Sequence, residues 1–284
     1  MPINSLDHLM RKTTDGSLFS ADWMLTTNIA FAAGRWQDMS RNGIYPSPNL
    51  YPGTSLTWVD CNSSTAFAIP TGPDTIAGSG MTKHCIFASA LTAAPAGVPG
   101  MFVLVDLQGY WPGINTATTL LQTLSGTPSL RYTNGEGLKL YPVVTATTST
   151  GTPNISLSYT NQAGTSGRAL GQTVTCVASS PIGSLYANLW APFLPLAGGD
   201  TGVQNVATVQ MSAATTGAIA LCLAKPILTV PVATVSNMVE RDFVNQFTSL
   251  PRIMNNACLT WLFYPGAATV INSNFYGSLE FVWG

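Results

Sequence analysis

Few side chains in this sequence could perform acid–base, nucleophilic or metal chemistry. The chain contains two histidines, His8 and His84, and the second of them precedes Cys85. A thiol beside an imidazole suggests a nucleophilic dyad, yet adjacent residues of a strand point to opposite faces of a sheet. No partner residues stand near His84 at the spacing of a metal site. We therefore expect no catalytic residue, no metal and no cofactor.

The acidic side chains give no better catalytic pattern. A glycosidase needs two carboxylates roughly 5–10 Å apart, whereas the 12 acidic residues of this chain are scattered. The Walker A, nucleophile-elbow and complete dinucleotide-binding patterns are missing, so we predict that the chain is not an enzyme. Five acidic residues stand in or beside turn-forming sequences and are expected to hydrogen-bond turns: Asp60, Asp74, Asp106, Glu136 and Asp200.

The charge balance argues against a nucleic-acid partner. Arg35 with Trp36, and Arg131 with Tyr132, could stack on bases. A net charge of −1 and a pI of about 6.0, however, leave no basic footprint. We therefore expect structural roles for these arginines and no bound nucleic acid.

Cysteine usage and the N-terminal sequence bear on location. The five cysteines are odd in number and form no C-x-x-C pair, which predicts reduced structural thiols and assembly in a cytoplasm. Residues 1–15 are charged and lack the apolar core of a signal peptide. The longest uncharged stretches are broken by proline or rich in Thr and Gln, so we expect no membrane insertion.

The shortage of charge is the most unusual property of the composition. Charged residues make up 8% of the chain, against about 25% in an ordinary soluble domain. Between residues 143 and 224 the only ionised side chains are Arg168 and Asp200. A free monomer normally uses surface charge to stay apart from its copies. This shortage favours a chain that hides much of its surface against other subunits.

Strand patterns dominate from residue 54 onward. Ile155, Leu157 and Tyr159 alternate with serines, as in a half-buried strand, and residues 101–107 (MFVLVDL) read as a buried strand. Glycine and proline separate these runs, which favours a β-sandwich or barrel. The other predicted strands are residues 143–148, 173–178, 203–211, 218–224, 227–235, 258–263 and 279–283.

Two segments depart from the strand pattern. Residues 1–53 hold a disproportionate share of the charges and begin with a short predicted helix that ends at Gly16. We interpret them as an arm or lead-in, which packs either on a neighbouring subunit or on its own domain. Later, Asn237 can cap a helix on which Val239, Phe243 and Phe247 share one face. This helix would close one end of the sandwich or contact another subunit.

Several short segments look familiar. They are SYTNQAGTSGR at 158–168, GRW at 34–36, RYTNG at 131–135 followed by Gly137, and AGGDTGV at 197–203. These segments resemble stretches that recur in structural proteins of tailed bacteriophages. The resemblance implies a virion component, such as a capsid decoration or cement protein, and it brings no catalytic residues with it.

Together these observations predict an all-β, mostly antiparallel protein: a jelly-roll-type sandwich (54–284) with an N-terminal arm (1–53) and one late helix. The expected function is a homo-oligomeric decoration protein, a trimer on the capsid surface of a tailed-phage virion. Its partners would be the major capsid protein or other virion proteins. The alternative is a tail or receptor-binding protein that attaches to host surface glycans, with Trp111, Tyr132 and Trp190 as stacking residues. Subunit contacts are predicted at Trp23, Phe31, Trp36, Tyr45, Phe243 and Phe247.

Overall fold

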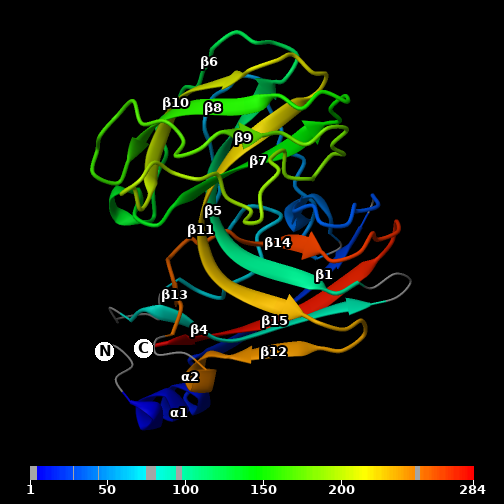
Figure 1. Cartoon of the computed structure of the whole chain (residues 1–284). Coiled ribbons are helices and arrows are strands. Elements are labelled where there is room, and N and C mark those ends of the chain that lie inside the picture. Colours follow the sequence, from blue (N-terminus) through cyan, green and yellow to red (C-terminus); the bar gives the residue numbers. More distant parts are fainter. Residues whose placement is uncertain (1–4, 28, 44, 75–80, 94–97, 247–249) are drawn as a thin grey trace.

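A computed structural model describes the chain except for residues 1–4, 28, 44, 75–80, 94–97 and 247–249. Its strands form three sheets, and every pairing between named strands in this part of the chain is antiparallel. The predicted all-β, mostly antiparallel fold class is confirmed. Figure 1 shows one sheet at the top, one at the bottom and a third running between them.

We name the sheets by their position in Figure 1. The lower sheet has the order β1-β15-β4-β12, with β13 beside β4: β1 (Leu18–Thr26), β4 (Lys83–Ala93), β12 (Val239–Asp242), β13 (Arg252–Ile253) and β15 (Asn274–Trp283). The upper sheet has the order β6-β10-β8-β9: β6 (Gln122–Thr123), β8 (Asn154–Asn161), β9 (Val174–Thr175) and β10 (Val203–Met211). The central sheet has the order β2-β14-β5-β11-β7, with β3 beside β5: β2 (Gln37–Asp38), β3 (Val59–Asp60), β5 (Gly100–Asn115), β7 (Lys139–Ala146), β11 (Ala218–Val232) and β14 (Leu259–Pro265).

Two long strands of the central sheet, β5 and β11, belong to both ends of the molecule (Figure 1). Near the top, Trp111 and Leu221 pack against the upper sheet. Near the bottom, Phe102 and Val230 pack against the lower sheet. All four side chains are fully buried, and each such burial contributes about 1.5–3 kcal/mol. The chain therefore folds as two β-sandwiches that share their central strands.

The single strand β11 replaces the two strands predicted at 218–224 and 227–235. Its pairing with β5 shifts register between Leu223 and Ala224 and again between Pro226 and Leu228. Such bulges keep a strand paired while bending it. The pairing with β7 ends at Ala224. Beyond that residue, no strand of the described chain pairs with this edge of β11. The N–H that Pro226 lacks therefore interrupts no ladder of hydrogen bonds on that side.

The N-terminal segment packs on its own chain. β1 pairs with β15 from Leu18↔Val282 to Thr26↔Asn274. The indole of Trp23 lies 5.4 Å from that of Trp261, and the ring of Phe31 stacks on Phe275 at 6.2 Å, both inside the lower core. Of the two alternatives left open for residues 1–53, packing on the chain's own domain is the one seen for these residues.

Irregular segments between residues 36 and 68 cover the remaining face of the central sheet. Trp36, Tyr51 and Phe67 are buried there against Tyr141 and other residues of the sheet. The hydroxyl of Tyr51 donates a hydrogen bond to the Asp38 carboxyl group, which also accepts from the backbone N–H of Ser40 at 2.9 Å. Burial raises the pKa of Asp38. These bonds fix the covering segment over the sheet.

Helical structure is limited to short elements. α1 (Leu6–Thr14) is the predicted N-terminal helix and is capped by Ser5. Of the predicted late helix, the described residues are helical only in α2 (Phe243–Gln246), and its beginning is replaced by a strand, because Val239–Asp242 pair with the edge of β4 as β12. The described residues also form two short 3-10 helices, η1 (Met39–Arg41) and η2 (Thr133–Gly135). Among the helices of the described residues, none has the length and hydropathy to cross a bilayer.

A buried ion pair joins the central sheet to the segment after β6. The Arg131 guanidinium donates to both Asp106 carboxylate oxygens, Nη2 to Oδ1 at 2.6 Å and Nε to Oδ2 at 3.2 Å. It also donates to the carbonyl oxygens of Cys61 and Leu107. Asp106 is fully buried in β5 and does not lie in a turn, which corrects its predicted role. Arg131 has the structural role expected of it.

Removing the arginine from this pair should be strongly destabilising. Arg131→Met leaves the Asp106 carboxylate buried and unpaired, and loss of one partner of a buried pair costs about 3–5 kcal/mol. Urea unfolding followed by circular dichroism measures the loss. The matched control is Arg11→Met, which breaks the exposed pair with Asp7 and should change stability by less than about 1 kcal/mol. Equal effects of the two substitutions would contradict the structural role of the buried pair.

Candidate functional site

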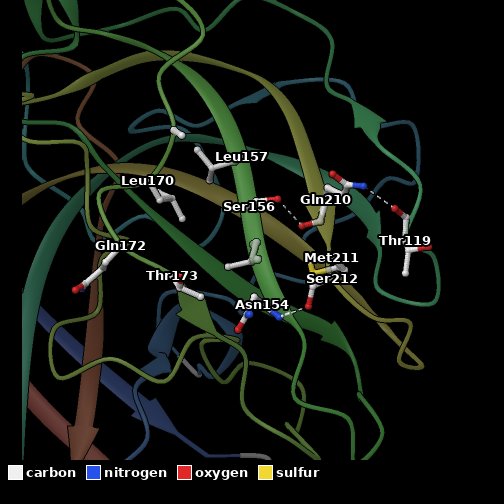
Figure 2. A pocket seen from close by; sticks show the side chains of 12 residues that line it. Thr119, Asn154, Ser156, Leu157, Leu170, Gln172, Thr173, Gln210, Met211 and Ser212 are labelled. Atoms are coloured by element: carbon white, nitrogen blue, oxygen red, sulfur yellow. Dashed lines mark hydrogen bonds between the residues drawn. The ribbon is translucent and has the colours of Figure 1, made fainter.

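An open groove crosses the upper sheet. Its volume is about 590 Å³, and it is lined by β8, β10, the segment between residues 169 and 173, and Thr119. Figure 2 shows serine, threonine, asparagine and glutamine side chains around it, together with Leu157, Leu170 and Met211. The groove is therefore a mixed polar and apolar surface.

The sequence builds this surface through the two-residue period of its strands. Ile155 and Leu157 point into the upper core, as predicted, so Ser156 faces outward between them. On β10, Gln210 faces outward beside it, and its amide donates to the carbonyl oxygen of Thr119 at 2.9 Å. The hydroxyl of Ser156 donates to the backbone carbonyl of Gln210 at 3.3 Å (Figure 2). The outward positions of a half-buried strand could have indicated these residues from sequence alone.

An interruption in strand pairing opens one wall of the groove. Ile155 pairs with Val174, and Tyr159 pairs with Arg168. The short stretch of β8 between these pairs therefore faces the longer segment 169–173. That segment is held by the N–H of Gly171, which donates to the carbonyl oxygen of Pro195 at 3.0 Å. The extra residues on this side bow outward, as in an extended bulge, and form the wall.

The chemistry available in this groove is hydrogen bonding to a neutral ligand. Among the described residues that line it, no side chain is ionised at neutral pH. Hydroxyl and amide groups can donate to and accept from sugar or peptide groups. General acid–base catalysis needs a group that titrates near the working pH, and these lining side chains include none. The groove is thus a binding surface in character.

Beside the groove, a closed hydrogen-bond network surrounds Asp200. Its carboxylate accepts from the Tyr159 hydroxyl at 2.6 Å, from the Asn161 amide at 2.7 Å and from Arg168 Nε at 2.9 Å. The hydrogen bond from Arg168, followed by that from Tyr159, lowers the pKa of Asp200 to about 2. Because the carboxylate is engaged by three side chains, the network holds together the loops at the end of the upper sheet.

Three of the four phage-like segments meet at this network. Residues 158–168 and 197–203 supply its members, and the 131–137 segment packs against them. Thr201 donates from its hydroxyl to a Glu136 carboxylate oxygen at 2.9 Å. A Cβ on Gly202 would collide with the carbonyl oxygen of Gly135, so the backbones approach closely. The residue types in these segments are therefore explained by packing and hydrogen bonding.

His84 and Cys85 do not form a dyad. Both lie in β4, where Cys85 is fully buried and His84 is only partly so. The imidazole Nε2 hydrogen-bonds the Thr82 hydroxyl at 2.8 Å, whereas the thiol donates to the carbonyl oxygen of Phe87 at 3.3 Å. Burial raises the pKa of Cys85 to about 12, which keeps the thiol protonated and a poor nucleophile. All five cysteines are buried and free.

The aromatic side chains considered for glycan stacking occupy three different environments. Trp111 is fully buried and packs on Trp58 at 4.5 Å. Tyr132 is partly buried under the ammonium group of Lys225, which lies 5.4 Å from its ring. Trp190 is 91% exposed. Only Trp190 presents an open face to solvent.

The residues predicted as subunit contacts also differ in how far their side chains are exposed. Four of them are at most 2% exposed: Trp23, Phe31, Trp36 and Phe243. Because the chain's own core covers these side chains, they cannot reach a neighbouring subunit, and the prediction is corrected for these four residues. Tyr45 is 52% exposed, so a contact through its ring stays a proposal. Phe247 lies outside the described residues.

Acid should weaken the Asp200 network. The pKa of Asp200 in the folded chain, about 2, lies below its ordinary value of 3.8, so the network's stabilisation is present above about pH 4 and is lost as the pH falls toward 2. We expect Asp200→Asn to be less stable than wild type at neutral pH and to lose less stability between about pH 4 and 2. Urea unfolding across this range measures both effects. Asp7→Asn, in an exposed pair, serves as the control, and wild-type pH dependence in Asp200→Asn would contradict the assignment.

Comparisons with known proteins leave the family open. No family model matches the chain, and no curated protein matches it. Solved structures that match include infectious bursal disease virus of the Gt strain (8% identity, 94% of this chain and 80% of that chain, TM-score 0.20). Others are the VP2 subviral particle of that virus (9%, 93% and 80%, 0.19) and its Gx strain (9%, 94% and 81%, 0.19). TM-scores this low do not establish a shared fold or function.

Proposed function

We propose that this chain is a structural component of a virion, specifically a homo-oligomeric decoration protein on the head of a tailed bacteriophage. The phage-like segments and the scarcity of charge support this proposal. The chain carries only 11 basic and 12 acidic residues in 284. Several of these are engaged internally, as in the Arg131–Asp106 and Arg168–Asp200 pairs. Few charges are left to keep copies apart in solution.

The observation that carries the proposal is the exposed indole of Trp190. Its backbone is fixed, because the Trp36 indole N–H donates to the Trp190 carbonyl oxygen at 3.1 Å. Its side chain is nonetheless 91% exposed. Tryptophan is enriched among the residues that dominate binding energy at protein interfaces. A rigid loop that holds an indole in water is well suited to insertion into a neighbouring subunit.

Other large apolar side chains are exposed in the loop before β6. Leu120 is 74% exposed and Leu121 is 59% exposed. Single exposed leucines are common, whereas two in succession form a small exposed apolar patch. Repeated symmetry multiplies each such contact in an assembly. Trimer formation and attachment to a capsid protein through these residues, with Tyr45 as a further contact, are parts of the proposal.

A second candidate function is attachment to host surface glycans. The groove on the upper sheet favours it, because its described lining offers several hydroxyl and amide groups without ionised side chains. Sugars also stack on aromatic rings, and Trp190 is available for such stacking. This reading would make the chain a tail or receptor-binding protein.

Sedimentation tests the assembly. We expect the wild-type chain to sediment as an oligomer at micromolar concentration and Trp190→Ser to dissociate about tenfold more readily, because about 1.4 kcal/mol of interface burial is lost. Met10→Ser, which alters an exposed side chain on α1, should leave the association unchanged. A monomeric wild-type chain at this concentration contradicts the oligomer. Particles assembled without the chain should then be compared with complete ones for stability.

A glycan array separates the two candidate functions. A head decoration protein should give no signal, whereas a receptor-binding protein should bind a defined set of glycans. Binding that is lost in Gln210→Ala and retained in Met10→Ser would support the groove and the second function. Silence on an array that includes host surface polysaccharides would remove it.

A further inference from the structure

A second groove lies beside the open edge of β11. It has a volume of about 450 Å³ and is lined by residues 132–133, 225–227, 250–252 and 254. Its described lining includes two basic side chains, Lys225 and Arg252, and no carboxylate. Pro226, Ile227 and Met254 provide apolar surface between them. In a chain with so few charges, two cations on one groove need an explanation.

The ammonium group of Lys225 is held in place by neutral groups. Its Nζ donates to the backbone carbonyl oxygen of Glu136 at 3.3 Å and lies 5.4 Å from the centre of the Tyr132 ring. It passes over Gly137, where a Cβ would collide with Nζ and where φ is +72°. The glycine therefore both forms the turn and admits the lysine. None of these contacts neutralises the charge of Lys225.

Arg252 is the second cation. It lies in β13, opposite His84 of β4, and is exposed. Within the described part of the chain, its guanidinium has neither a hydrogen bond nor an ion pair. Arg131 and Arg168, by contrast, each bind a carboxylate. Five donors of Arg252 are thus free to bind a ligand.

The surrounding charges leave the groove positive. Lys139 is close enough to Lys225 for the two to repel each other: burial, followed by this repulsion, lowers the pKa of Lys139, while the Glu136 carboxylate acts in the opposite direction. Two carboxylates lie near the groove but do not line it. Asp106 is paired with Arg131, whereas Glu136, which accepts a hydrogen bond from Thr201, keeps its negative charge and lies outside the lining of the groove. A groove whose described lining has two cations and no carboxylate favours an anionic ligand.

We propose that this groove binds the phosphate group of a phosphate monoester. The guanidinium fork of Arg252 matches phosphate geometry, and Lys225 supplies a second, point-like positive charge in the lining of the same groove. Two positive charges balance the dianion. The apolar surface of Pro226, Ile227 and Met254 then covers the organic part of the ester. This site is independent of both candidate functions proposed above.

Calorimetric titration at low ionic strength tests the site, with phenyl phosphate and inorganic phosphate as probes. We expect saturable binding of both, with phenyl phosphate the tighter because its ring contacts the apolar wall. Arg252→Gln should weaken binding about tenfold, the low end for a charged hydrogen bond. Lys225→Gln should have a similar effect. Arg11→Gln removes an exposed cation from α1 and should leave binding unchanged.

Three results would overturn the proposal. The first is the absence of saturation at probe concentrations up to about 10 mM, well above a millimolar Kd. The second is binding that survives Arg252→Gln; this variant decides the matter even if Lys225→Gln fails to fold, since the Arg252 side chain is exposed and has no hydrogen bond or ion pair within the described residues. The third is equal affinity for the two probes, which would exclude a monoester site with an apolar wall.

Discussion

The pairing of β5 with β11 is the constraint on which the rest of the structure depends. It extends from Ala218↔Asn115 to Val232↔Gly100, with bulges that bend both strands. One half of this ribbon completes the upper core, and the other half completes the lower core. The covering segments from Trp36 to Phe67 bury its outer face. Neither sandwich has a complete core without these two strands.

Asp106, the buried carboxylate that Arg131 binds, lies on this ribbon. A chain that avoids charge nevertheless places a carboxylate in the middle of its longest strand and satisfies it with two hydrogen bonds from one guanidinium. The N–H of Cys258 donates to the same carboxylate at 2.9 Å. Three segments far apart in sequence therefore converge on one acidic group. Such a polar contact has one geometry, which favours a single arrangement of the segments around it.

Much of the strand pattern could be predicted from sequence, since period-two alternation and buried runs are local signals. β10 has the predicted bounds, 203–211, and the core face of β8 is as predicted. The strands β1 and β4 were not predicted, and other predictions failed for identifiable physical reasons. Lys225 and Pro226 were predicted to separate two strands, because the sequence alone does not show whether a proline lies on an unpaired edge of a strand. Residues 239–242 have a helical spacing that pairing with β4 overrides. The partnership of Asp106 and Arg131 has no local signal at all. The grooves depend on such long-range placement, so their residues could be suspected only as outward-facing polar positions.

The shared ribbon also determines how the molecule bears mechanical load. A pull applied between the top and the bottom of the protein runs along β5 and β11, parallel to their strands. Their ladder of backbone hydrogen bonds is then loaded in shear, so many bonds must break together. A pair of domains joined by a linker would stretch at the linker instead.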